Sequence, residues 1–170
     1  MQKFFVIFLL YILFLVQLCF FVHFHFQNQV PNLILISLLF FIFFEKPEEN
    51  FSFLIAALGG LFSDIFSSSF LGIQILIFFL LTFLLKQVVK TIHKLHIFWF
   101  LSFLISSLIF TNTLSYFIYD FPFFHITSFS LHWGEIFSIP EILYNLIFGT
   151  VSFYLFLFAR KYVLETSRKF

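Results

Sequence analysis

The chain has 170 residues, of which 62% are hydrophobic and only 10% are charged, and its formal net charge is +1. Soluble domains carry about 25% charged and roughly 45–50% apolar residues, so this composition excludes a soluble globular domain. It indicates an all-α integral membrane protein with a single domain over residues 1–170, in contact with membrane lipid. The near-neutral charge argues against a nucleic-acid partner.

Six apolar runs predict six transmembrane helices, over residues 4–22, 30–44, 51–66, 70–85, 97–118 and 139–159. The first run has no small-residue cleavage site, so we interpret it as an uncleaved anchor. The second run is short, because residues 29–44 cover about 24 Å at 1.5 Å per residue, against a hydrocarbon core of about 30 Å. It either crosses the membrane by tilting and thinning it, or re-enters on one side.

The placement of basic residues supports the division into six spans. With a cytoplasmic N-terminus, the cytoplasmic segments are residues 1–3, 45–50, 86–96 and 160–170, and they contain all nine Lys and Arg residues. The outer segments contain none, as the positive-inside rule requires. Without the second span, Lys86, Lys90 and Lys94 would lie outside. We therefore expect both termini in the cytoplasm.

The segment between the last two spans has its own signals. Residues 119–138 are rich in aromatic and histidine residues and contain no Lys or Arg, which predicts a segment lying at the outer headgroups. The last helix has a clear start signal, because Ser138 and Glu141 have the spacing of a capping box and Pro140 lies in the first turn.

A cluster of small and polar residues interrupts the apolar sequence at residues 59–72. Ala56, Gly60 and Asp64 recur every four residues, next to Gly59, so one face of the third span is small and polar and is expected to pack against another helix. Gly72 continues the close approach at the start of the fourth span. Asp64 is either a functional charge near the membrane or a structural anchor that bonds to the turn 67–69, and we favour the anchor.

The last span carries a second polar stripe, formed by Glu141, Asn145, Gly149 and Ser152. Asn145 lies about one turn inside the membrane, and we hypothesise that it bonds across to the third span near Asp64. A third set on the fifth span is interpreted as helix-packing contacts; it consists of Ser102, Ser106 and Thr113.

We expect no catalytic residue, no metal site and no cofactor. The histidine pairs His93 with His96, and His132 with Glu135, match no closed zinc site, and no cysteine accompanies them. The sequence contains no nucleophile elbow, no P-loop and no evident pair of buried carboxylates.

The residues Gly59-Gly60-Leu61-Phe62-Ser63-Asp64, followed by Ser69-Phe70-Leu71-Gly72, resemble the rod shape-determining protein MreD family. The matching positions are Gly60, Asp64, Gly72 and, in the last span, Asn145. The resemblance implies a non-catalytic component of the bacterial inner membrane. Such a component works with MreC-like and MreB-like proteins, a RodA-type glycosyltransferase and its transpeptidase in lateral wall synthesis. It also implies a fold resembling the substrate-binding components of energy-coupling-factor transporters.

That fold suggests an alternative function, a substrate-binding membrane component of a vitamin transporter. Such components typically carry an Ala-x-x-x-Ala face in the first span, and residues 4–22 contain no alanine. Asp64, Asn145 and the outer residues His132, Trp133 and Glu135 offer polar groups for a ligand, so this alternative stays open.

Overall fold

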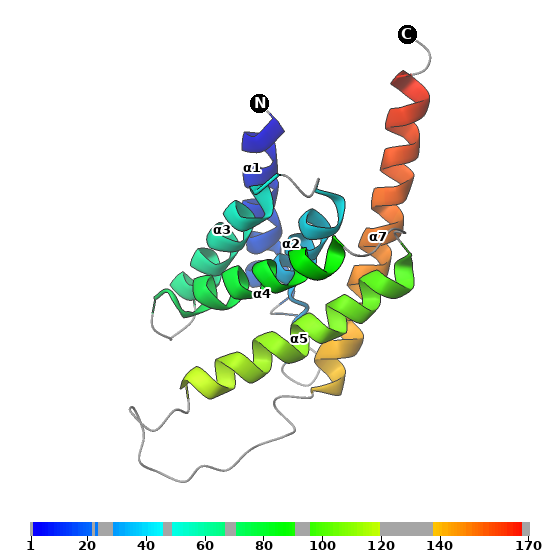
Figure 1. Cartoon of the computed structure of the whole chain (residues 1–170). Helices are drawn as coiled ribbons and strands as arrows, with labels where there is room; N and C mark the ends of the chain where they lie inside the picture. Colours follow the sequence, from blue (N-terminus) through cyan, green and yellow to red (C-terminus); the bar gives the residue numbers. More distant parts are fainter. Residues whose placement is uncertain are drawn as a thin grey trace.

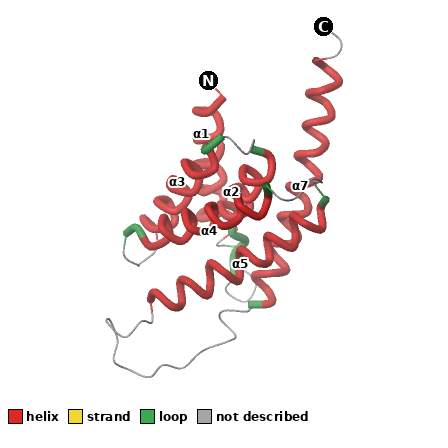
Figure 2. Tube along the Cα trace, in the orientation of Figure 1, coloured by secondary structure: helices red, strands yellow, loops and turns green. Residues whose placement is uncertain are grey.

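The computed structural model describes residues 2–21, 23, 29–45, 49–66, 71–90, 96–119 and 138–167. Within these ranges the chain forms six α-helices and a π-helical turn, without a β-strand. In chain order they are α1 (Gln2–Val16), η1 (Gln17–Phe21), α2 (Leu33–Phe44), α3 (Phe51–Phe66), α4 (Ile73–Val89), α5 (Ile97–Tyr119) and α7 (Ile139–Ser167). They form one helical bundle (Figure 1), and Figure 2 shows that loops are a small share of the described chain.

Four helices differ from the predicted spans. The predicted first span, 4–22, is divided between α1 and the π-helical turn η1, and α2 begins at Leu33, after the predicted start at residue 30. In the fourth span both ends move, and in the last span one end moves. The predicted start at residue 70 moves to Ile73, because Gly72 has a positive φ of 105° and precedes the first helical residue. The same helix continues to Val89 and so includes Lys86, whereas the sequence predicts a loop from residue 86. Helix α7 runs on to Ser167, past the predicted end at residue 159.

Helix α2 occupies the centre of the bundle. It packs against α1, α3, α4, α5 and α7, and nine of its twelve residues are buried. Its aromatic side chains tie it to α5, with ring centroids 4.8 Å apart for Phe40 and Phe100 and 5.4 Å apart for Phe43 and Phe103. Twelve helical residues cover only about 18 Å, which is less than the roughly 30 Å of a membrane's hydrocarbon core.

One helix among the described residues is long and apolar enough to cross a membrane by itself, over Ile97–Ile118 in α5, and 28% of it is buried in the bundle. The other apolar helical segments are shorter, and they are Leu10–Phe21, Leu33–Phe44, Phe51–Ile65, Ile73–Val89 and Ile139–Leu155. The predicted all-α class is confirmed.

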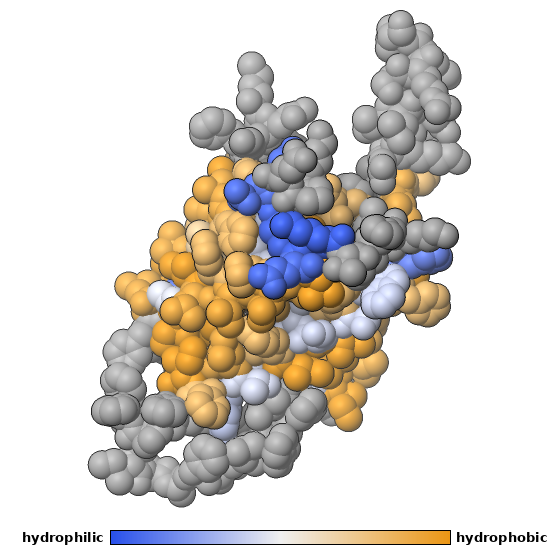
Figure 3. Space-filling model, in the orientation of Figure 1, coloured by the Kyte–Doolittle hydropathy of each residue, from blue (hydrophilic) through white to orange (hydrophobic). Residues whose placement is uncertain are grey.

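The surface is largely apolar. Exposed fractions reach 79% for Phe98, 73% for Leu71 and 70% for Ile139. Figure 3 shows apolar residues over most of the visible face, with a hydrophilic group between α1 and α7. The start of α1 and the end of α7 lie at the same end of the molecule (Figure 1). This apolar exterior is the pattern of a protein that is surrounded by lipid.

Candidate functional site

Four buried polar side chains lie at the N-terminal ends of α2, α3 and α4, and they are Asn145, Ser52, Lys86 and Asp64. The first backbone N–H groups of a helix have no partner within it, and in apolar surroundings each unpaired N–H is costly. Each of these three helices receives acceptor groups from other parts of the chain. The candidate site is therefore a set of three capping clusters.

The α4 cluster is organised by Asp64, which is 1% exposed at the end of α3. Its carboxylate accepts hydrogen bonds from the backbone N–H groups of Gly72 (2.8 Å), Gln74 (3.0 Å) and Ile75 (3.4 Å). Gly72 is the N-cap residue and has no side chain to cap the helix. Asp64 supplies the missing acceptor, and its negative charge also suits the positive end of the helix dipole.

Gly60 allows α3 and α4 to approach closely enough for this contact. A Cβ atom at Gly60 would lie 2.4 Å from the Cα of Ile75, which is within the backbone of α4. A Cβ at Gly59 would lie 2.6 Å from Cγ2 of Ile34 in α2. Ala56, one turn before Gly60, is fully buried. The small-residue face of α3 thus lies at backbone distance from α4 at Gly60 and against a side chain of α2 at Gly59.

The α2 cluster takes its acceptors from three elements. The N–H of Asn32 donates to Oδ1 of Asn145 in α7 at 2.8 Å, and the N–H of Leu33 donates to Oε1 of Gln17 in η1 at 2.9 Å. The side chain of Asn32 itself accepts from the N–H of Leu35 at 3.0 Å. Because α2 begins inside the bundle, these amides take the place that water has at an exposed helix end.

Asn145 is fully buried, and both ends of its amide are used in this cluster. Its Nδ2 donates to the backbone carbonyl of Glu141 at 2.8 Å, while Oδ1 accepts from Asn32. The predicted bond between Asn145 and Asp64 is therefore wrong. The central helix α2 takes the amide of Asn145, while Asp64 caps α4.

The rest of the α7 stripe faces α5. The carboxylate of Glu141 accepts a hydrogen bond from Nδ2 of Asn112 at 2.9 Å. Gly149 is buried, and a Cβ there would lie 2.6 Å from Cδ1 of Leu104. The predicted helix start after Ser138 is confirmed, but the carboxylate of Glu141 bonds to the neighbouring helix α5.

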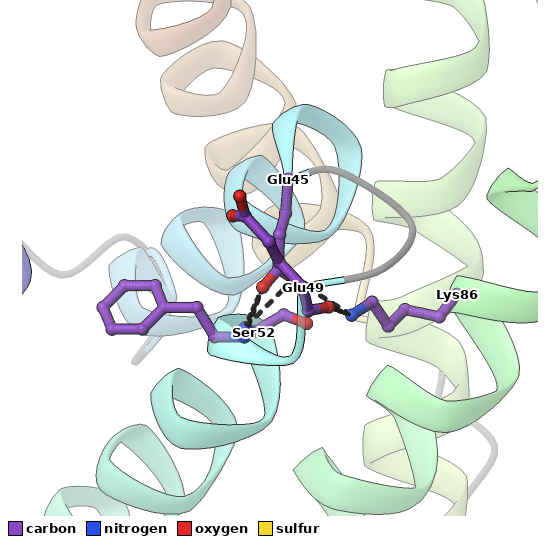
Figure 4. A network of polar contacts seen from close by, with 5 residues as sticks. Glu45, Glu49, Ser52 and Lys86 are labelled. Carbon is purple, nitrogen blue, oxygen red and sulfur yellow. Dashed lines mark hydrogen bonds and ion pairs between the residues drawn. The ribbon is translucent and has the colours of Figure 1, made fainter.

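The α3 cluster contains a buried ion pair. The carboxylate of Glu45 accepts from the N–H groups of Phe51 and Ser52, and Nζ of Lys86 lies 3.2 Å from Oε2 of Glu45. Lys86 also donates to the backbone carbonyl of Glu49, and its Nζ lies 5.3 Å from the ring centroid of Phe53. Figure 4 shows Lys86 reaching from α4 towards Glu49 and Glu45. The Glu45 and Lys86 side chains are only 3% and 10% exposed.

Sequence reasoning missed Gln17, Glu45 and Lys86 as site residues. A single carboxamide inside the apolar run 4–22 was the available signal for Gln17, whereas Glu45 and Lys86 resembled ordinary loop charges. Several predictions lie outside the described residues, namely those for the turn 67–69, the segment 120–137 with His132, Trp133 and Glu135, and His93. No group of three or more metal-binding side chains occurs in the described ranges.

The outward surface is largely apolar, and the described helices pack around a buried central helix. The side chains of Asp64, Asn145 and Glu45 accept hydrogen bonds from backbone N–H groups at helix starts. These features define a helical membrane protein in which several of the described buried polar groups bond to backbone at helix ends. A family model described as rod shape-determining protein MreD matches residues 1–162. The chain belongs to this family of bacterial membrane proteins that determine rod shape. No curated protein and no solved structure matches the chain.

Proposed function

We propose that the protein is a non-catalytic, multi-pass component of the bacterial inner membrane that serves as an assembly platform in the rod-shape machinery. In this role it brings MreC-like and MreB-like proteins together with a RodA-type glycosyltransferase and its transpeptidase. The family match over residues 1–162 carries the proposal, because it spans almost the whole chain.

The capping clusters support a structural role. Asp64, Asn145 and Glu45 are each bonded to backbone N–H groups of another segment. Side chains held in this way stabilise one arrangement of helices and are poorly placed for proton transfer or nucleophilic attack. A rigid bundle with an apolar exterior suits a protein that holds membrane partners in fixed positions.

We further propose six membrane crossings with both termini in the cytoplasm. The start of α1 and the end of α7 lie at the same end of the bundle, as an even number of crossings requires (Figure 1). The Glu45–Lys86 cluster then lies towards the cytoplasmic side and the Asp64 cluster towards the outer side. Capping from within the bundle explains how the short helix α2 is accommodated in the membrane.

A depletion experiment in the source bacterium tests the function. Depleting the protein is expected to round the cells, and the wild-type chain is expected to restore the rod shape. The variant Asp64→Leu is expected to fail in this rescue, whereas Val88→Leu on the exposed side of α4 serves as the matched control. Cells that keep their shape on depletion but lose vitamin uptake would contradict the proposal and support a transporter component.

Cysteine labelling tests the crossings independently. The background is Cys19→Ser, which removes the only cysteine. In this background Asn50→Cys places a single exposed thiol just before α3, and Leu71→Cys places one between α3 and α4, at the other end of α3. A membrane-impermeant maleimide is expected to label Leu71→Cys in intact spheroplasts and Asn50→Cys only after lysis. The reverse pattern would overturn the orientation, and labelling of both in intact spheroplasts would overturn the crossing of α3.

A further inference from the structure

The hydroxyl of Ser52 is buried near the start of α3 without a hydrogen-bond partner. Ser52 is 0% exposed, and among the described residues its Oγ is the only buried side-chain polar atom that has no partner. A buried hydroxyl that makes no hydrogen bond is costly, so most such groups in folded proteins bond to protein or to ordered water. The Oγ of Ser52 therefore needs a partner beyond the described protein groups.

Five other buried or half-buried hydroxyls bond back to their own helix. Each donates to the carbonyl four residues before it, and the pairs are Ser37 with Leu33, Ser63 with Gly59, Thr82 with Phe78, Ser107 with Phe103 and Thr150 with Leu146. Ser52 is the second residue of α3, so the residue four positions before it precedes the helix. Its place at the start of the helix removes this usual partner.

The hydroxyl residues on the other side of α5 do not pack within the bundle. The sequence predicts packing contacts for three of them, but the structure leaves all three exposed, and they are Ser102, Ser106 and Thr113. The buried hydroxyls of α5 are those of Ser107 and Thr111. Ser102 therefore offers a surface serine with which the buried Ser52 can be compared.

The carboxylate next to Ser52 already has its bonds. Oε1 of Glu45 accepts from the N–H groups of Phe51 and Ser52, and Oε2 accepts from the N–H of Ser52 and lies 3.2 Å from Nζ of Lys86. A carboxylate has about four acceptor sites, which these four contacts fill. Figure 4 shows Ser52 beside this carboxylate. The hydroxyl of Ser52 thus lies next to a charged pair without an acceptor of its own.

Ser52 lies on the face of α3 that packs against α4. It precedes Ala56 by four residues and Gly60 by eight, which places the three on one side of the helix. A Cβ at Gly60 would lie 2.4 Å from the Cα of Ile75 in α4, so this side faces α4. Only small side chains lie on this side of α3 near Ser52.

Lys86 reaches the same end of the interface from α4. Its ammonium has three N–H donors, of which one serves Glu45 and another the backbone carbonyl of Glu49. Its Nζ also lies 5.3 Å from the ring centroid of Phe53, which follows Ser52 in the chain. One N–H of Lys86 therefore remains for a further acceptor in the vicinity of Ser52.

We propose that a single water molecule is bound inside the bundle between Ser52 and Lys86. Water suits this place because it accepts from the remaining N–H of Lys86 and bonds to the hydroxyl of Ser52 as donor or acceptor. The ammonium of Lys86 disfavours a cation here, and the carboxylate of Glu45 disfavours an anion. The water completes the hydrogen bonds at the start of α3. This binding site is independent of the proposed role in rod shape.

An experimental structure of the full-length protein, at a resolution that shows ordered water, tests the site directly. A density peak is expected about 2.5–3.0 Å from Oγ of Ser52 in the wild type, and it is expected to be absent in Ser52→Ala. The absence of a peak in the wild type, or a protein group bonded to Oγ in its place, would overturn the proposal. A metal ion surrounded by oxygen ligands would overturn it as well.

The direction of the stability change in Ser52→Ala is an independent test. Loss of a hydroxyl that bonds to water is expected to raise the equilibrium constant for unfolding about fivefold, as measured in detergent micelles. Loss of an unpaired hydroxyl would instead remove a desolvation cost and stabilise the protein. Ser102→Ala makes the same change at an exposed position and is expected to stay within about twofold of the wild type. A Ser52→Ala variant at least as stable as the wild type would sink the proposal.

Discussion

Asp64 at the end of α3 accepts a hydrogen bond from the backbone N–H of Gly72, 2.8 Å away, immediately before α4. The same carboxylate accepts the N–H groups of Gln74 and Ile75, so one side chain closes the hairpin and caps the second helix. This relationship explains the pattern of Gly60, Asp64 and Gly72. Gly60 allows α3 and α4 to approach closely, Asp64 caps the N-terminus of α4, and Gly72 is the residue from which α4 begins.

Removing the acceptor at Asp64 is expected to weaken this hairpin. Asp64→Ala leaves buried N–H groups unpaired, and its expected cost is about 1–3 kcal/mol in the free energy of unfolding. Asp64→Asn keeps one acceptor oxygen and is expected to fall between Ala and the wild type. Reversible unfolding in detergent micelles measures both values. An Asp64→Ala variant as stable as the wild type would show that the cap is unimportant.

The glycines are expected to differ sharply in their tolerance of alanine. Gly60→Ala places a Cβ 2.4 Å from the Cα of Ile75, where only backbone movement relieves the clash, so a loss of about 3 kcal/mol or more is expected. Gly149→Ala clashes with a side-chain atom, Cδ1 of Leu104 at 2.6 Å, and with no backbone atom, and alanine favours the helix by about 1 kcal/mol, so a smaller loss is expected. Thermal unfolding of the two variants compares them directly. Equal losses would contradict backbone contact at Gly60.

The helical class, the approximate helix positions and the small-residue face of α3 were predictable because they depend on local composition and on period. The long apolar runs separate at polar turns, and Ala56, Gly60 and Asp64 repeat with the helical period. The outward direction of Ser102 and Ser106 was not predictable in this way. Which face of α5 packs inward depends on the neighbouring helices, and the small hydroxyl residues on its two faces look alike in sequence.

The partners of the buried polar residues were also beyond the sequence. Asn145 pairs with α2 because α2 is short and begins inside the bundle, which is a consequence of tertiary packing. Lys86 joins Glu45 because α4 continues one turn past its apolar run. In both cases the contact forms because a helix end elsewhere in the chain has unpaired backbone groups. The spacing of residues along the chain does not show where such a helix end will lie.

The ion pair between Glu45 and Lys86 is expected to be intolerant of single changes. Lys86→Met leaves a buried carboxylate without its cation, and Glu45→Leu leaves a buried ammonium and uncapped N–H groups at α3. The expected cost is about 3–5 kcal/mol in the free energy of unfolding for each variant.

The exchange Glu45→Lys/Lys86→Glu restores opposite charges but is not expected to restore stability, because a lysine at the N-terminus of α3 opposes the helix dipole. Unfolding in micelles measures all three, with Lys90→Met on the exposed end of α4 as the control. Full recovery in the exchanged variant would show that the pair acts only through its mutual attraction.

The clusters around Asp64 and Asn145 are expected to act independently. Asp64→Leu removes the cap of α4, and Asn145→Leu leaves the N–H of Asn32 unpaired at the start of α2. Because the two side chains share no hydrogen bond, the loss in the double variant is expected to equal the sum of the single losses to within about 0.5 kcal/mol. A complete double-mutant cycle, measured by unfolding in micelles, tests this.

Asn145→Leu combined with Gln17→Leu is the positive control, because both residues cap α2 and their losses are expected to be non-additive. A coupling of 1 kcal/mol or more between Asp64 and Asn145 would revive a direct link between α3 and α7.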